Sequence, residues 1–256
     1  GILPGEKVTA EISKIRGIKI GEDSISPNRH VDINNEDDLL DMIHFVRETT
    51  GKPTGIKAVI GAYGWVDSLC RAIKKRGIAS APDFITIDSA DGGTGAAPMS
   101  LIDYMGLPLR ESLPLVVDIL IAHNLKDRVK VVASGKMVTP ADVAWALCTG
   151  ADFITSARGF MFSLGCIQAL QCNKNTCPTG ITTHNKKLQS GLNPILKAVR
   201  VKNYVANMVN EVGIIAHSCG VNEPRELQRF HARMVVENGK SLPLNEIYKL
   251  DKYIAE

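Results

Sequence analysis

The chain has 256 residues, of which 45% are hydrophobic, 22% charged and 5% aromatic, and its formal net charge is +3. This composition is typical of a soluble globular protein, and the small charge and low aromatic content argue against nucleic-acid binding or membrane contact. No apolar run approaches the ~18 residues of a membrane span. The opening residues, GILPGEKVTA, contain no signal peptide and no initiator Met. We therefore expect a cytoplasmic protein whose sequence begins inside a longer polypeptide.

The first fifty residues predict charged loops with one short helix, followed by an amphipathic helix. Residues 1–35 are rich in glycine, proline and charge, and they indicate one helix near Val8 to Arg16. Asn34 or Asn35 is expected to cap a second helix, which has an acidic first turn and ends at Gly51. Charged loop residues are usually solvated, although four of them could reach an anion: Lys7, Arg16, Arg29 and His30.

Four short apolar runs alternate with helical segments in the middle of the chain. The runs cover residues 56–60, 84–88, 129–133 and 153–156, and the helices cover about 66–76, 110–124 and 139–150. This alternation predicts an α/β fold with a parallel sheet and right-handed crossovers. Ligand sites in such folds lie at the carboxyl ends of the strands.

Unusual residues collect at these strand ends. Lys57 interrupts the first run; it is either paired, in contact with a ligand, or exposed on an edge strand. A glycine-rich turn from Asp91 to Ala96 follows the second run, and its free N–H groups could face an anion or a flat ring. The turn matches neither dinucleotide nor P-loop fingerprints. The turn Ala157-Arg158-Gly159 after the fourth run could hold a phosphate.

Three cysteines follow the fourth run at the spacing C-x5-C-x4-C, namely Cys166, Cys172 and Cys177. Cysteine thiolates are the usual ligands of iron–sulfur clusters, and the spacing differs from the C-x2-C pairs of structural zinc sites. A zinc site would recruit His184 or Cys219. Alternatively, the three are unrelated thiols. Six cysteines in a chain of this size, three of them clustered, favour a reducing compartment and a metal over a disulfide framework.

After Ile181 the spacing of apolar residues predicts helices over Leu196 to Cys219 and Arg225 to Glu237, and no strand. We expect residues 1–220 to form the main body, with the cysteine loop at residues 164–181, and residues 221–256 to form a helical extension.

Four motifs resemble the FMN-binding synthase domain of glutamate synthase over most of residues 1–220. They are LPGEKV at Leu3 to Val8, DGGTGAAP at Asp91 to Pro98, GLP at Gly106 to Pro108 and LGC-x5-C-x4-CPTGI at Leu164 to Ile181. That family has a (β/α)8 barrel with FMN and a three-iron, four-sulfur cluster, and it makes L-glutamate from 2-oxoglutarate and ammonia. Departures at Ser89-Ala90, Ser134-Gly135-Lys136 and Ser156 to Gly159 make this chain similar to the shorter, glutaminase-free relatives.

The resemblance implies roles for individual positions. Lys57 would lie near the flavin pyrimidine edge, and Lys57 and Asp91 would be catalytic. Cys166, Cys172 and Cys177 would ligate the cluster. The flavin contacts would be Lys57, Gly92, Gly93, Thr94, Gly95, Ser134, Gly135, Lys136, Ala157, Arg158 and Gly159. The electron donor would be ferredoxin or a pyridine-nucleotide reductase subunit. The chain lacks an N-terminal cysteine nucleophile for glutamine hydrolysis, so ammonia would come from elsewhere.

A complete barrel has eight strands, whereas the sequence predicts four. We therefore expect the C-terminal part of a barrel, completed by a longer chain or a partner. Two alternative hypotheses are an FMN oxidoreductase acting on another 2-oxo acid or amine, and a non-catalytic module stabilised by metal.

Overall fold

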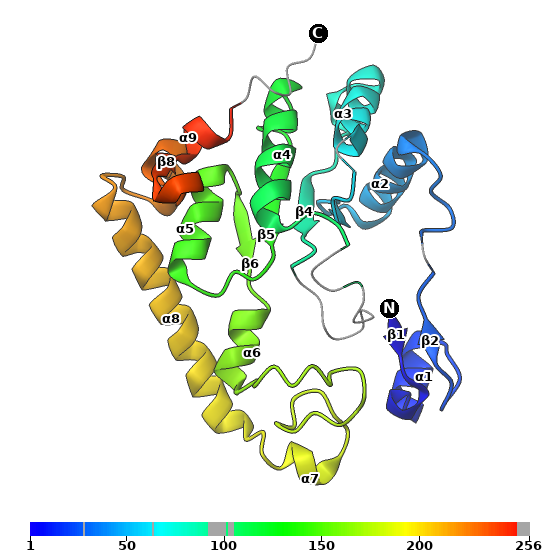
Figure 1. Ribbon diagram of the computed structural model, residues 1–256. Helices are drawn as coiled ribbons and strands as arrows, with labels where there is room; N and C mark the ends of the chain where they lie inside the picture. The colour runs from blue at the N-terminus through cyan, green and yellow to red at the C-terminus, as the bar shows by residue number, and fades with distance from the viewer. Residues whose placement is uncertain (28, 63, 92–100, 102–104, 250–256) are drawn as a thin grey trace.

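The structure is a computed structural model of residues 1–256 (Figure 1), and it describes all of them except residues 28, 63, 92–100, 102–104 and 250–256. Its centre is a parallel sheet with the strand order β3-β4-β5-β6. The strands are β3 (Ile56–Ala58), β4 (Phe84–Asp88), β5 (Lys130–Ser134) and β6 (Phe153–Thr155). The helices between and after them are α3 (Gly64–Arg76), α4 (Leu109–Ala122), α5 (Pro140–Thr149) and α6 (Arg158–Leu164). The predicted α/β fold with a parallel sheet is confirmed.

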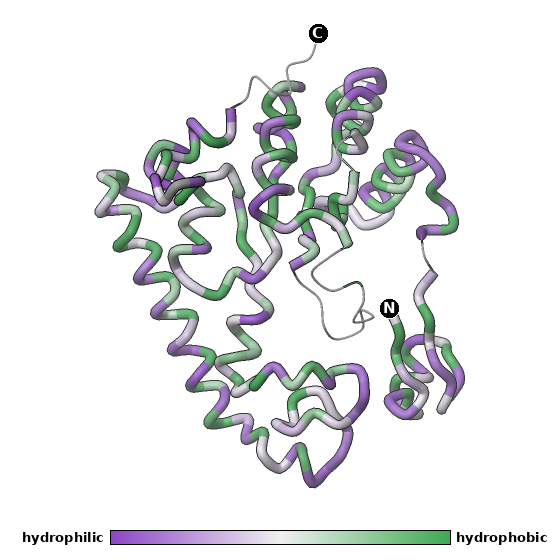
Figure 2. Tube along the Cα trace, viewed as in Figure 1, coloured by the Kyte–Doolittle hydropathy of each residue, from purple (hydrophilic) through white to green (hydrophobic). Residues whose placement is uncertain are grey.

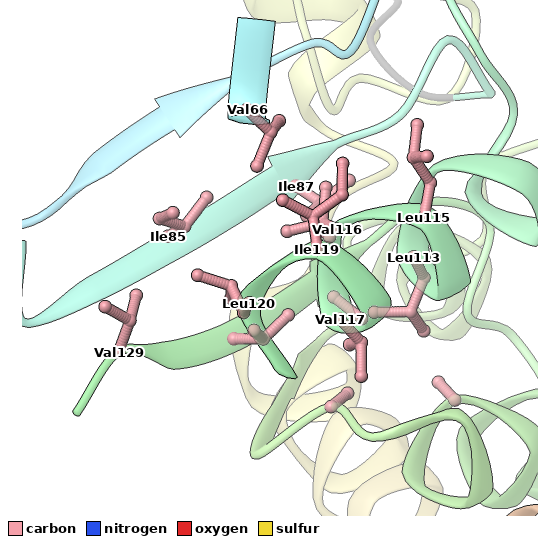
Figure 3. Close-up of a cluster of buried hydrophobic side chains, with 14 of the residues drawn as sticks. Val66, Ile85, Ile87, Leu113, Leu115, Val116, Val117, Ile119, Leu120 and Val129 are labelled. Atoms are coloured by element: carbon pink, nitrogen blue, oxygen red, sulfur yellow. The ribbon is translucent and has the colours of Figure 1, made fainter. Parts of the chain in front are cut away.

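Apolar residues from alternate strand positions form the core against the helices. Ile85 and Ile87 of β4 and Val131 of β5 are at most 2% exposed and belong to one hydrophobic core cluster. Figure 3 shows Ile85 and Ile87 beside the apolar side chains of α4. Alternation follows from the two-residue period of a strand. Burying each such side chain contributes about 1.5–3 kcal/mol, so this layer is the main source of stability.

The other face of the sheet is more open and more polar. Residues between the buried ones are half-buried or exposed, and Asp88 and Ser134 stand in register on neighbouring strands near their carboxyl ends. Within the described residues β3 and β6 are the outer strands, each paired on one side only. The described residues thus contain a four-stranded parallel sheet. One face of this sheet is open, and each of its two outer strands has an edge that no further described strand covers.

The helix ends have the caps that the sequence predicts. Helix α2 (Glu36–Thr50) begins at Asn35, whose side chain accepts a hydrogen bond from the Asp38 N–H, and it ends at Gly51 with φ of 62°. Helix α5 begins at a capping box formed by Thr139 and Asp142. These short-range signals fix the boundaries through contacts within and next to each helix.

The N-terminal residues form a small unit of their own. Strands β1 (Ile2–Leu3) and β2 (Ser24–Ile25) pair antiparallel, and a 3-10 turn (Gly5–Lys7) and helix α1 (Ala10–Arg16) lie between them. The helix is confirmed. The prediction of loop alone around Ser24 is wrong, because two-residue strands carry too little periodicity to recognise.

The chain beyond the cysteine loop forms α7 (Lys186–Gln189) and the long helix α8 (Pro194–Ser218), which packs against α5 and α6. Figure 2 shows apolar and polar residues alternating along α8. The described residues include no helix with the length and apolarity needed to cross a bilayer.

The prediction of a helix over Arg225 to Glu237 is wrong. The residues form 3-10 turns at Pro224–Glu226, Arg229–His231 and Glu237–Gly239 and a hairpin of β7 (Arg233–Val235) and β8 (Ser241–Pro243), followed by α9 (Leu244–Ile247). A tertiary contact overrides the helical spacing: Arg229 Nη2 lies 2.5 Å from Asp118 of α4, which is 1% exposed.

Candidate functional site

Lys57 and Asp88 form an ion pair on the open face of the sheet. The Lys57 Nζ lies 2.9 Å from the Asp88 Oδ2, and the two side chains are 65% and 32% exposed. The structure thus combines two of the expectations for Lys57, since it lies on an outer strand and is also paired. An exposed ion pair contributes only about 0–1 kcal/mol to stability. The pair is therefore more informative as a cation held in place beside an open surface.

Asp91 connects the loops that follow β4 and β5. Its Oδ2 accepts a 2.7 Å hydrogen bond from the Leu109 N–H at the start of α4, and its Oδ1 lies 3.7 Å from the Lys136 Nζ. Ser89 N–H donates to the Ser134 carbonyl at 3.0 Å. These contacts give Asp91 a structural role whatever else it does. Four of the predicted contacts, Gly92, Gly93, Thr94 and Gly95, lie outside the described residues.

Gly135 is required by packing within the protein. A Cβ added there would collide with the Ser89 Oγ and approach the Leu109 Cβ to 3.2 Å. The absence of a side chain at Gly135 therefore does not by itself indicate an approaching phosphate. A substitution at Gly135 would disturb Ser89 with or without a ligand.

Tyr204 of α8 joins the loops after β5 and β6. Its hydroxyl donates to the Val138 carbonyl at 3.0 Å and lies 3.3 Å from the Ser156 Oγ, which donates to the Met137 carbonyl. A Cβ on Gly159 would collide with the Tyr204 Oη. The two loops expected to hold a phosphate are thus fixed to one tyrosine. The sequence does not mark this role, because an aromatic residue on a helix is usually just a packing residue.

Arg158 and Gly159 begin α6, directly after β6. The preceding residue, Ala157, makes no side-chain capping hydrogen bond to the helix. The first N–H groups of a helix have no partners within the helix, and an uncapped start leaves them available to an anion or to water. Helix α6 then ends at Gly165, one residue before Cys166.

The cysteine loop lies below the sheet between α6 and α7 (Figure 1). All three of its cysteines are half-buried and none forms a disulfide. The Cys166 Sγ accepts a hydrogen bond from the Gln168 N–H at 3.4 Å, and the Cys177 Sγ lies 3.3 Å from the Thr179 Oγ1. Within the described part of the chain, no three His, Cys, Asp or Glu side chains converge as the ligands of a single metal ion would.

Cys177 has the properties of a thiolate. Burial acts to raise the pKa of its thiol, but hydrogen bonds from Thr179 and Thr182 outweigh this effect and lower the pKa to about 6. The Thr182 hydroxyl is buried, and its contact with the Cys177 sulfur falls short of a full hydrogen bond. A low-pKa thiol that two threonines contact fits a loop that binds a group through sulfur.

A hollow of about 590 Å³ lies at the opposite end of the sheet, lined by Arg47, Asp83 and Arg128 among others. Both arginines bind the Asp83 carboxylate, at 3.1 and 2.9 Å, and also donate to backbone carbonyls. Burial acts to raise the pKa of Asp83, but the Thr54 N–H and the two arginines keep it below its usual value. These contacts give Arg47, Arg128 and Asp83 a structural role at this end of the sheet.

The parallel sheet and its helices place this chain among the α/β proteins, and many proteins of that class bind ligands at the carboxyl ends of their strands. The chain belongs to the glutamate synthase family: the family model described as "Conserved region in glutamate synthase" matches residues 1–222.

Two relatives illustrate the similarity. The glutamate synthase large subunit-like protein YerD of Bacillus subtilis (strain 168) is 40% identical over 96% of this chain and 47% of its own length. The archaeal glutamate synthase [NADPH] of Methanocaldococcus jannaschii is 35% identical over 94% of this chain and 47% of its own length. The chain thus spans about half the length of the curated relatives it matches.

A mutant flavocytochrome b2 with pyruvate bound aligns over 87% of this chain and 42% of its own, with a TM-score of 0.44 and 19% identity. A similarity at this level does not define the fold.

Proposed function

We propose that this chain carries one side of the FMN and iron–sulfur site of a glutamate synthase-type oxidoreductase, which forms L-glutamate from 2-oxoglutarate and ammonia. The observation that carries the proposal is the continuity of α6, which begins at the uncapped turn after β6 and ends one residue before Cys166. The turn that we propose binds phosphate and the cysteine loop thereby lie at the two ends of one short helix. The family and the names of both relatives support the same conclusion.

The strand ends would hold FMN. The backbone at Ser134, Gly135 and Lys136 and the turn Ala157-Arg158-Gly159 would bind its phosphate, as late-strand loops do in (β/α)8 barrels. Lys57, fixed by Asp88, would place an ammonium group near the ring, where a cation stabilises negative charge. Asp91 and the turn from Gly92 to Gly95 would lie beside the ring and the substrate.

The cysteine loop would hold a three-iron, four-sulfur cluster through Cys166, Cys172 and Cys177. Each thiolate would bind a different iron, so the three sulfurs need not converge on one point as ligands of a single ion do. The low pKa of Cys177 fits this donor set. When bound, FMN supplies hydride transfer and the cluster supplies single electrons; this chain's residues bind both and orient the substrate.

Further strands would close the sheet into a (β/α)8 barrel. The open face and the unpaired edges of β3 and β6 favour completion by another segment of a longer chain or by a partner, because parallel sheets are rarely left uncovered. We propose ferredoxin or a pyridine-nucleotide reductase subunit as the electron donor.

The test is glutamate formation from 2-oxoglutarate and ammonium under an artificial reductant, with the chain alone and with the chain inside a full-length relative. We expect activity and stoichiometric FMN only when the remaining strands are present. Lys57→Met should abolish the activity, whereas Lys52→Met, at an exposed position away from the rim, should not. Turnover of 2-oxoglutarate by the monomeric chain alone would contradict the proposal that further strands complete the barrel. Activity only with other 2-oxo acids or amines would contradict the proposal that 2-oxoglutarate is the substrate.

A further inference from the structure

Lys7 connects the N-terminal unit to the cysteine loop. Its Nζ donates to the carbonyl of Cys172 at 2.6 Å and to the carbonyl of Thr182 at 3.1 Å, across 165 and 175 residues of sequence. The lysine is half-buried and does not behave as the solvated loop residue that the sequence predicts.

The two acceptors lie on either side of Cys177. One ammonium group therefore fixes both ends of a segment that contains two of the three clustered cysteines. Hydrogen bonds from a charged donor contribute about 1.5–3 kcal/mol, roughly twice the contribution of neutral ones. The contact helps to hold a loop that contains no strand and no helix between Leu164 and Lys186.

Lys7 is itself held in place. It ends the 3-10 turn in which its N–H donates to the Pro4 carbonyl, and the next residue, Val8, is 3% exposed. Gly5 N–H donates to the Asp23 carboxylate at 2.6 Å. The ammonium group thus projects from a fixed backbone.

We propose that Lys7 is a positioning residue for the iron–sulfur site: it holds the segment from Cys172 to Thr182 in the conformation that presents Cys172 and Cys177 to the cluster. The proposal rests on the proposed function for the cluster itself. It also gives the N-terminal unit a role, because Lys7 joins that unit to the loop.

The experiment compares four forms of the full chain. Lys7→Met keeps the stem and removes the charge, Lys7→Arg keeps charge and donors, and Lys14→Met changes an exposed lysine of α1 in the same unit. The first measurement is the alkylation rate of each cysteine in the metal-free chain, by mass spectrometry. The second is iron retention against a chelator after anaerobic reconstitution with iron and sulfide.

We expect Lys7→Met to speed alkylation of Cys172 and Cys177 by about tenfold or more, because losing ~1.5–3 kcal/mol of local stability raises the open population by at least that factor. Cys166 should respond less, since its N–H is bonded to the Met161 carbonyl of α6. Iron should be lost correspondingly faster. Lys7→Arg should restore both values to within about threefold of wild type, and Lys14→Met should change neither.

The inference is overturned if wild type and Lys7→Met show equal alkylation and equal iron retention, or if Lys7→Arg behaves as Lys7→Met. A wild-type chain that takes up no iron would overturn the cluster assignment and this inference together. The failure of the inference alone is recognised when wild type takes up iron and Lys7→Met matches it in both alkylation and iron retention.

Discussion

The sheet core and the cysteine loop are stabilised in different ways. In the core, side chains such as Ile87 and Val131 are fully buried and shared among several elements. In the loop, Ile167 and Leu170 are 66% and 44% exposed, and Gln168, Leu170 and Asn175 have positive φ angles. Positive φ is costly for residues other than glycine. The core thus depends on apolar area, whereas the loop depends on a few polar contacts and, as we propose, on bound iron.

The largest loss of unfolding free energy is expected where a buried ion pair attaches the C-terminal segment to the core. Arg229→Ala leaves Asp118 buried without its cation, which should cost about 3–5 kcal/mol of unfolding free energy in chemical denaturation. The paired change Arg229→Met with Asp118→Leu should recover most of the loss. A loss below about 1 kcal/mol for the single variant would show that this contact does not join the segment to the core.

A cavity in the sheet core should have the next largest effect. Ile87→Ala removes a fully buried side chain between β4 and α4 and should cost about 2–5 kcal/mol. Under native conditions the alkylation rates of the loop cysteines should stay at their wild-type values. Faster alkylation at low denaturant would contradict the separation of the two regions.

The core was also the region that the sequence predicted well. Strand β4 was predicted at its observed bounds, and Asn35, Gly51 and Thr139 marked helix ends correctly, because periodicity and capping are local signals. The partners of Lys57, Lys7 and Gly159 could not be predicted, since Asp88, the Cys172 carbonyl and Tyr204 reach them only through tertiary packing. Of the three partners, Asp88 is the most predictable from the sequence, because it ends a predicted strand next to the strand of Lys57.

Tyr204 lies between the two regions and should have an intermediate effect. Tyr204→Phe removes the hydroxyl that joins Val138 and Ser156, at an expected cost of about 0.5–1.5 kcal/mol. Hydrogen exchange should accelerate at residues 137–139 and 156–159 and remain unchanged in β4. In a chain that binds FMN, its affinity should fall as well. Unchanged exchange in both loops would show that the tyrosine does not hold them.

The smallest change in stability is expected for substitutions around Cys177, where the reactivity of the thiol should change clearly instead. With a pKa of about 6, its thiol is mostly ionised at neutral pH, so alkylation should rise with pH to a plateau above about pH 7. Thr179→Val should move the midpoint upward by removing a hydroxyl 3.3 Å from the sulfur. Thr176→Val is the matched control, because that hydroxyl bonds to Gln171. A midpoint near pH 9 for the alkylation of wild type would contradict a Cys177 thiol that is ionised at neutral pH.

The most direct test is the iron and acid-labile sulfide content of the anaerobically purified chain, measured with its visible spectrum. We expect iron and sulfide in a ratio of three to four, and loss of the visible absorption in each of Cys166→Ser, Cys172→Ser and Cys177→Ser. The unfolding free energy of the sheet should change by no more than about 0.5 kcal/mol in these variants, as at surface positions away from the core. Tightly bound zinc in place of iron, or a chain purified without metal, would contradict the proposed iron–sulfur cluster.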